Sequence, residues 1–220
     1  MKKIIYFLEF LLIKFLFIIF KIIGYKSASN LGCYIGKIIG PKFRSKKLII
    51  ENLKKFKTSI DNNEINKIIN EMWGNYGRIL AEYPYISNFR KKKLENYLEI
   101  EGMHNLEIIK KNKKPVIFVS GHFNNFELMA MQLEKAGINL AAIYRPLNNK
   151  YLNNTMEHIR KKYICKKQIP KGISGTKKIL QYFKNGTSIA LMIDQRVTEG
   201  IMSELFDKKA LTTTIPGQFV

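Results

Sequence analysis

Cysteine, arginine and acidic residues are all scarce in this 220-residue chain. The two cysteines, Cys33 and Cys165, match neither a zinc site nor a disulfide framework, so we expect the body of the protein to face a reducing compartment. Only six of the 38 basic residues are arginines, and 17 acidic residues leave a net charge of +21. That excess favours polyanionic partners, such as anionic lipid, a phosphorylated glycolipid, an acidic carrier protein or nucleic acid.

One long apolar run stands apart from the rest, in residues 1–24, MKKIIYFLEFLLIKFLFIIFKIIG. Its apolar part has about the 20-residue length that a bilayer core requires. Glu9, Lys14 and Lys21 interrupt it and fall within an arc of roughly 140° at 100° per residue. We predict a membrane-anchor helix, either a tilted span or an in-plane amphipathic helix. A cleaved signal peptide and a buried core helix are the alternatives.

The order of apolar runs and helical periodicity predicts the fold class. From Lys114 onward, short apolar strands are expected at 115–120, 139–145 and 187–194, and helices at 125–137, 149–163 and 175–186. Upstream, helices are expected over 62–82 and 90–112, with a lysine-rich surface helix in 42–57. The alternation implies an α/β fold with a mainly parallel sheet flanked by helices. We therefore predict one domain over residues 25–220, with its site beyond the carboxyl ends of the strands.

Residues 118–130, FVSGHFNNFELMA, place a histidine where a strand gives way to a helix. Gly121 lets the backbone turn after the strand, and Asn125 lies among the capping positions before the helix. Glu127 falls in the first helical turn, where the helix dipole favours its charge. We expect the turn to bring the side chains of His122 and Glu127 together.

A carboxylate beside an imidazole holds the tautomer that accepts a proton from a hydroxyl. The sequence has no Gly-x-Ser-x-Gly elbow and no cysteine suitably placed after a strand, which favours direct attack by an acceptor hydroxyl over a covalent enzyme intermediate. A structural His122 with Glu127 as an ordinary first-turn acid explains the same residues, and both interpretations remain open. His104 and His158 are expected to be structural or surface residues.

Six stretches resemble, in the same order, the lipid A biosynthesis acyltransferases, which are the lauroyl/myristoyl transferases of Gram-negative bacteria. The stretches are MWGNYGRILAEYP, EGMHNLEIIKKNKKPVIFVSGHF, GHFNNFE, IYRPLNN, LMIDQ and LFDKKALTTTIPGQF. The likeness extends from about Gly24 to the end of the chain, and the His-x4-Glu motif of the family corresponds to His122 and Glu127.

The resemblance implies a glycerolipid acyltransferase-like fold and transfer of a fatty acyl group from acyl carrier protein to a hydroxyl of a Kdo-bearing lipid A precursor. The expected location is the bacterial inner membrane, with the catalytic domain on the cytoplasmic face. The partners implied are acyl carrier protein, a phosphorylated glycolipid and the membrane. The sequence shows no nucleic-acid-binding motif, and neither a metal nor a bound cofactor is indicated.

The resemblance also assigns roles to individual residues. His122 becomes the general base, and Glu127 orients it. Arg160 and Arg145 bind phosphate or polarise the thioester carbonyl, and Asp194 and Asn125 belong to the same pocket. A structural salt bridge is the alternative for Arg145 and Asp194.

Two departures from the family pattern bear on these expectations. The common GHFGNWE has Asn124 and Phe126 here in place of Gly and Trp, which preserves the acid and the base. The family usually continues well past this point, so we expect further chain to complete the sheet and the acyl pocket. A glycerophospholipid acyltransferase, which generally has Asp where Glu127 stands, is the alternative function, and a non-enzymatic basic membrane-binding protein is the rival from another class.

Overall fold

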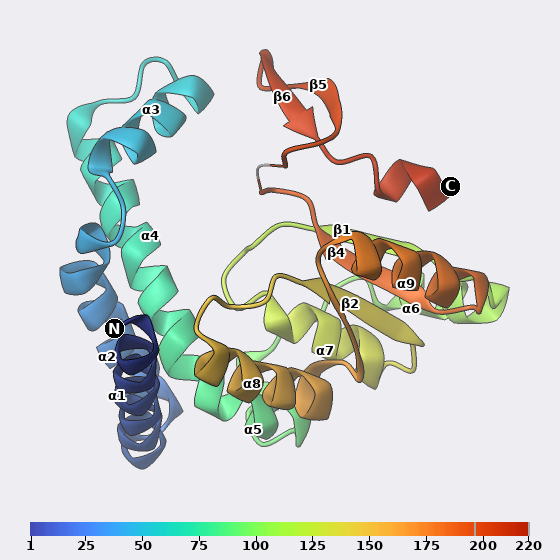
Figure 1. Ribbon diagram of the computed structural model, residues 1–220, viewed down its shortest axis with the longest axis horizontal. Helices are drawn as coiled ribbons and strands as arrows, with labels where there is room; N and C mark the ends of the chain where they lie inside the picture. Colours follow the sequence, from blue (N-terminus) through green and yellow to red (C-terminus); the bar gives the residue numbers. More distant parts are fainter. Residues whose placement is uncertain (196, 220) are drawn as a thin grey trace. The chain divides into compact units, whose positions relative to one another are not determined.

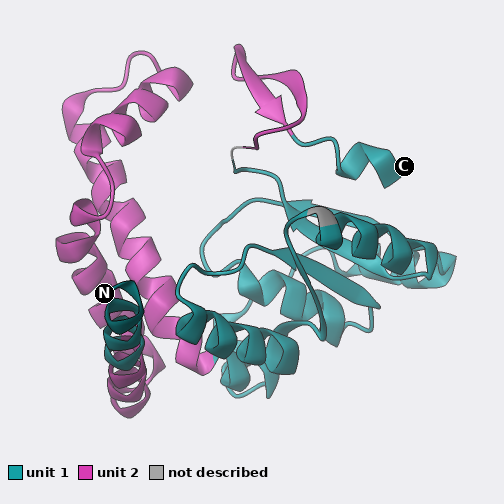
Figure 2. Ribbon diagram, viewed as in Figure 1, with its two compact units in different colours: residues 1–12, 86–196, 213–220 teal, residues 13–85, 197–212 magenta. Residues whose placement is uncertain are grey.

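The computed structural model describes residues 1–195 and 197–219 and forms two compact units (Figures 1 and 2). Unit 1 contains residues 1–12, 86–196 and 213–220, and unit 2 contains residues 13–85 and 197–212. The boundary predicted after residue 24 separates a membrane anchor from the rest of the chain, whereas the two units are defined by compactness. The predicted boundary therefore stays a prediction.

Unit 1 is built on a four-stranded sheet, in which all neighbouring strands are parallel. The strands are β1 (Ile117–Ser120), β2 (Leu140–Tyr144), β3 (Lys167–Pro170) and β4 (Ser188–Met192), in the order β1-β4-β2-β3. The expected α/β fold with a mainly parallel sheet is confirmed. Strands β1, β2 and β4 lie within the ranges predicted from the sequence, whereas β3 was not predicted.

Helices cover both faces of this sheet (Figure 1). They include α5 (Ile86–Arg90), α6 (Met103–Asn112), α7 (Glu127–Lys135), α8 (Lys150–Ile159) and α9 (Ile173–Lys184). Ala141 of β2 packs with Ile179 of α9 in the core cluster of unit 1. Because successive strand residues point to opposite faces, the buried Leu140 points away from α9, toward the face on which α7 packs.

The helix expected over 90–112 is wrong in its first half. Helix α5 ends at Arg90, a single 3-10 turn spans Glu95–Tyr97, and α6 begins only at Met103. Lys92 has a φ of 62° and Gly102 a φ of 73°, both in the left-handed region that ends or precedes a helix. At the other end of the chain, Pro216–Phe219 form a 3-10 turn.

Besides residues 13–23 of the N-terminal helix, unit 2 includes three α-helices and a hairpin. These elements are α2 (Tyr25–Ile39), α3 (Lys46–Phe56), α4 (Asn62–Glu82), β5 (Ile201–Leu205) and β6 (Lys208–Thr212), the last two pairing antiparallel. Helix α4 matches the predicted range 62–82, and the Asp61 carboxylate caps it by accepting a 2.9 Å hydrogen bond from the Glu64 N–H.

Helix α1 spans Lys2–Ile23, and most of its apolar side chains are exposed to solvent. In the described part of the chain, no helix combines the length and the apolarity needed to cross a bilayer. Glu9, one of the charges in the apolar run, accepts a 3.0 Å hydrogen bond from the side chain of Asn149 in unit 1. Phe7 packs edge-on against Tyr151 of α8 at 5.6 Å. The predicted membrane anchor over residues 1–24 stays a prediction.

Candidate active site

Two neighbouring strands deliver the central side chains of the site to the same edge of the sheet. In the parallel register of β1 and β4, Ser120 lies opposite Met192. His122 and Asp194 each come two residues later, where both strands have ended and their carboxyl ends adjoin. Parallel sheets collect binding groups at this edge, and the structure brings His122 and Asp194 into contact there.

The carboxylate of Asp194 holds His122 at two points. Its Oδ2 accepts a 2.7 Å hydrogen bond from the His122 backbone N–H, and its Oδ1 lies 2.7 Å from the imidazole Nδ1. Burial raises the pKa of Asp194, but the hydrogen bonds from His122 outweigh that effect, and the pKa lies below its ordinary value. Asp194 is therefore a carboxylate that accepts both bonds. Gly121 leaves room for it, because a Cβ there would lie 3.3 Å from Oδ2.

The outer nitrogen of the imidazole can act as a base. With Nδ1–H donated to Asp194, Nε2 carries the lone pair. The side-chain nitrogen of Gln195 lies 3.4 Å from Nε2, a long contact that is consistent with an amide donating weakly to it. About 28% of the His122 side chain is exposed, so a hydroxyl from solvent can reach Nε2. Phe126 packs edge-on against the ring, with the two centroids 4.6 Å apart, and fixes the other side of the imidazole.

The contact expected between His122 and Glu127 is absent from the described residues, because both groups have other partners. Glu127 is buried at the start of α7, and its Oε1 accepts hydrogen bonds from Nε and Nη2 of Arg160 at 2.8 and 2.5 Å. Only 13% of the Arg160 side chain is exposed, which makes this a buried ion pair. Phe126, immediately before Glu127, faces His122 instead.

Arg160 joins a second group of polar side chains at the end of β2. Its guanidinium lies over the Tyr144 ring at 5.5 Å, and the Tyr144 hydroxyl donates a 2.5 Å hydrogen bond to Glu157. Burial and the Glu157 carboxylate raise the pKa of Tyr144 to about 12. The hydroxyl of Tyr144 hence stays protonated and serves as a donor. Asn153 also donates to Glu157, at 2.8 Å.

The remaining predicted site residues lie around the same edge. Arg145 follows β2 directly and is exposed, and in the described part of the chain it makes no hydrogen bond or ion pair. Asn125 is half-buried in the turn between His122 and Glu127, where its carbonyl accepts a 3.0 Å hydrogen bond from the Leu128 N–H.

Exposed apolar side chains lie close in sequence to His122 and Asp194. Phe123, the neighbour of His122, is 76% exposed, Val119 of β1 is 45% exposed, and Ile193, just before Asp194, is 38% exposed. An exposed aromatic next to a base and an apolar strand end can bind an alkyl chain. Among the described residues, no group of His, Cys, Asp or Glu side chains has the arrangement of a metal site.

Sequence reasoning named residues that the structure gathers at this edge of the sheet, but it paired them differently. Asp194 was placed in the pocket by the family resemblance and by its strand-end position, yet its contact with His122 depends on β1 and β4 being neighbours, which the chain order does not reveal. Tyr144 and Glu157 were not proposed. The signals for Tyr144 were its position immediately before Arg145 at the end of a predicted strand and its place in the stretch IYRPLNN.

A protein-family model described as "Bacterial lipid A biosynthesis acyltransferase" matches residues 1–220, the whole of the chain. No curated protein matches the sequence.

Proposed function

Because the chain belongs to the bacterial lipid A biosynthesis acyltransferase family, we propose that it transfers a fatty acyl group from acyl carrier protein to a hydroxyl of a Kdo-bearing lipid A precursor. The observation that carries the chemistry is the contact between His122 Nδ1 and Asp194, which leaves Nε2 of the imidazole as the proton acceptor.

The reaction needs one base and no covalent enzyme intermediate. His122 Nε2 takes the proton of the acceptor hydroxyl while that oxygen attacks the carbonyl carbon of the thioester. The new C–O bond forms, the C–S bond breaks, and the proton passes from the imidazolium to the departing thiolate. Asp194 stabilises the imidazolium and keeps Nε2 turned toward the acceptor. The exposed side chains of Phe123 and Ile193 would contact the acyl chain.

The two arginines take different roles in this proposal. Arg145 is exposed at the sheet edge and can reach a phosphate group of the acceptor or the thioester carbonyl. The guanidinium of Arg160 is bound to Glu127, so we assign both residues to positioning. Their ion pair ties the first turn of α7 to the residues after α8, and it thereby fixes the turn that carries His122 and Asn125.

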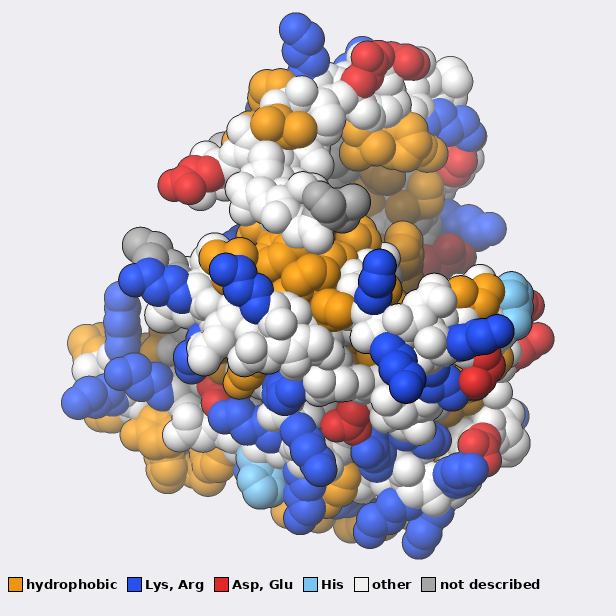
Figure 3. Space-filling model, turned by 90° about the vertical axis from the view of Figure 1, so that its right-hand side faces the viewer, with side chains coloured by type: hydrophobic (Ala, Val, Ile, Leu, Met, Phe, Trp, Pro, Cys, Tyr) orange, Lys and Arg blue, Asp and Glu red, His pale blue; other side chains and the backbone are white. Residues whose placement is uncertain are grey.

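Charge supports the proposed partners. Lys and Arg side chains are spread over much of the face shown in Figure 3, where acidic side chains are fewer, and the net charge is +21. Acyl carrier protein and a phosphorylated glycolipid are both acidic, and a basic surface speeds their encounter at low salt.

The exposed face of α1 supports a location at the membrane. Apolar side chains 37–78% exposed in this helix include a stripe at Ile4, Leu8, Leu11, Phe15, Ile18 and Ile22. At 100° per residue they fall within about 80° of arc. Lys3, Lys14 and Lys21 lie along one border of the stripe, where their ammonium groups can contact anionic headgroups. We propose that α1 binds the inner membrane and holds the site on its cytoplasmic face.

The test is acyl transfer from acyl carrier protein to a Kdo-bearing lipid A precursor, with mass spectrometry of the product. His122→Ala should lower the rate by a factor of about 10²–10⁴, the usual contribution of a general base. His104→Ala is the matched control, because His104 is an exposed residue of α6. If His122→Ala transferred the acyl group at an undiminished rate, His122 would not be the general base.

Two further measurements distinguish the proposed function from the alternative functions. Acylation of lysophosphatidate instead of the glycolipid would identify a glycerophospholipid acyltransferase, and salt-sensitive polyanion binding without transfer would identify a non-enzymatic protein.

The pKa of Asp194 is lowered, so its carboxylate stays charged as the pH falls from neutral to about 5. A loss of rate in that window therefore does not report protonation of Asp194.

A further inference from the structure

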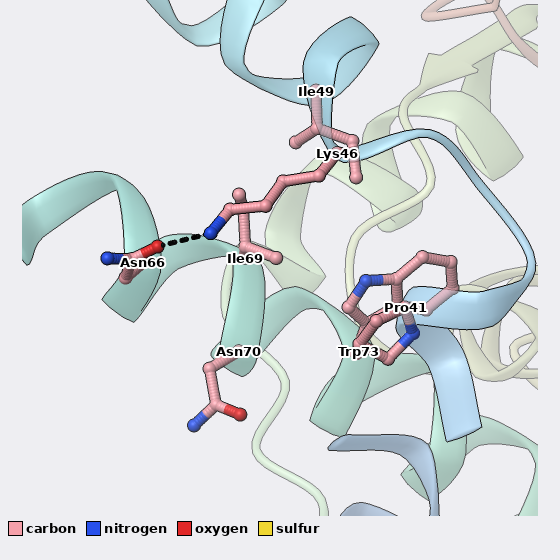
Figure 4. A pocket seen from close by; sticks show the side chains of 7 residues that line it. All are labelled: Pro41, Lys46, Ile49, Asn66, Ile69, Asn70 and Trp73. Atoms are coloured by element: carbon pink, nitrogen blue, oxygen red, sulfur yellow. Dashed lines mark hydrogen bonds between the residues drawn. The ribbon is translucent and has the colours of Figure 1, made fainter. Parts of the chain in front are cut away.

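Unit 2 contains a cavity that shares no residue with the cluster around His122 (Figure 4). Its volume is about 230 Å³, below the roughly 300–1,000 Å³ typical of pockets for drug-sized ligands. The walls come from the turn after α2, from α3 and from α4, and they consist of Pro41, Lys46, Ile49, Asn66, Ile69, Asn70 and Trp73. The cavity is therefore sized for a small molecule.

Trp73 supplies this cavity with a buried donor. The residue is only 9% exposed, and its indole Nε1 has no hydrogen-bond partner in the described part of the chain. A buried donor without an acceptor costs about 1–3 kcal/mol. Gly40 holds the ring in place, because a Cβ on Gly40 would lie 2.4 Å from two of the indole carbons.

Lys46 gives the cavity a single positive charge. Its Nζ donates a 2.9 Å hydrogen bond to the Asn66 side-chain oxygen, and Lys46 forms no ion pair with a carboxylate among the described residues. Figure 4 shows this bond across the lining, with Asn70 on the same helix as Asn66. None of the lining residues is acidic. The polar part of the wall thus offers an ammonium and amide N–H groups to an anion.

The apolar part of the wall selects the rest of the ligand. Pro41, Ile49 and Ile69, together with the indole face of Trp73, provide a hydrocarbon surface beside the donors. We propose that the cavity binds a small anionic amphiphile, specifically a medium-chain alkyl carboxylate with its head group at the donors and its chain against the apolar wall. One lysine matches one negative charge, which favours a carboxylate over a phosphate dianion. Nothing in this proposal depends on the chemistry assigned to unit 1.

The experiment uses the emission of Trp73, the one tryptophan of the chain, as a direct reporter of the cavity. Titration of the full chain with sodium octanoate should change that emission saturably. 1-Octanol, which has the same chain without the charge, should bind at least about tenfold more weakly, as expected for loss of a charge-assisted hydrogen bond. Acetate, which has the charge without the chain, should give no saturable change.

Lys46→Gln should weaken octanoate binding by about tenfold, because it removes the charge but keeps the polar contact with Asn66. Lys47→Gln is the matched control, since Lys47 is exposed on the same helix and does not line the cavity. Both substitutions lie on the surface and should leave folding intact. Equal octanoate affinity in the two variants, equal binding of octanol and octanoate, or no saturable change would each overturn the proposal.

Discussion

At the residue scale, the site depends on two carboxylates that have different environments. Asp194 is partly exposed and holds His122 in the tautomer that accepts a proton. Glu127 is buried and neutralises Arg160. A buried ion pair contributes little net stability, but removing one partner leaves an uncompensated charge. The two acids should therefore respond differently to mutation.

Glu127→Gln should lower the free energy of unfolding by about 3–5 kcal/mol, because the Arg160 guanidinium would lose its partner while buried. Arg160→Met should cost a similar amount. The double variant should recover much of the loss, since no buried charge remains. Chemical denaturation of the four proteins gives the coupling energy.

Glu107→Gln is the control for this cycle, because Glu107 makes an ion pair with Lys110 in which its side chain is 64% exposed. It should cost less than about 1 kcal/mol. If Glu127→Gln is no more destabilising than Glu107→Gln, the ion pair with Arg160 is not structural, and Glu127 returns as a candidate partner of His122.

The sequence identified His122, Glu127 and Asp194 but not their pairing, and the reason is physical. Nearness in the chain favoured His122 with Glu127, which are separated by one turn. The actual contact joins residues 72 positions apart, because β4 inserts between β1 and β2 in the sheet. Strand order is decided by packing of whole elements, which a local pattern does not encode.

At the element scale, burial separates β4, the most buried of the predicted strands, from the elements that were missed. Strand β4 shows four consecutive buried residues and reads as an apolar run. In β3, Ile169 alone is fully buried, and Pro170 ends it at the edge of the sheet. The hairpin of β5 and β6 is mostly exposed, so it has no apolar alternation to detect.

The crossing of α2 and α4 requires glycine at several positions. A Cβ on Gly77 would lie 1.9 Å from the Gly32 carbonyl oxygen and 3.0 Å from the Gly36 Cα. A Cβ on Gly32 would in turn lie 2.5 Å from the Ala81 Cβ. The two helix backbones therefore touch, and any side chain at these points forces them apart.

Gly77→Ala should destabilise unit 2 by at least about 1–3 kcal/mol, the usual cost of overpacking. Trp73 lies one turn away on α4, so its fluorescence during denaturation follows this unit. Gly217→Ala is the control, because a Cβ there meets nothing within 4 Å. A Gly77→Ala protein as stable as Gly217→Ala would show that the helices are not in backbone contact.

At the scale of the whole molecule, two properties would act on the membrane partner that we propose. The net charge of +21 attracts any anionic surface, and this attraction weakens as salt shortens the Debye length to about 3 Å at 1 M. The apolar stripe of α1 acts through burial, which salt does not screen. Binding to vesicles at low and high salt therefore separates the two contributions.

The triple variant Leu8→Gln, Phe15→Gln and Ile18→Gln keeps the charge of α1 and removes the centre of its apolar stripe, because these three residues are 58–60% exposed. Each substitution should weaken binding to phosphatidylglycerol vesicles by about tenfold, because burying one such side chain contributes about 1.5–3 kcal/mol. The loss should persist at high salt, where wild-type binding by charge alone has faded. Sedimentation with vesicles measures both conditions.

Ile108→Gln is the matched control, since Ile108 is a 55% exposed apolar residue of α6, outside α1. It should bind vesicles as the unmodified chain does. If the triple variant also binds normally at high salt, α1 is not the anchor. If all binding disappears at high salt in the unmodified chain, attraction of lysine for anionic lipid is sufficient, and the apolar stripe must serve another contact.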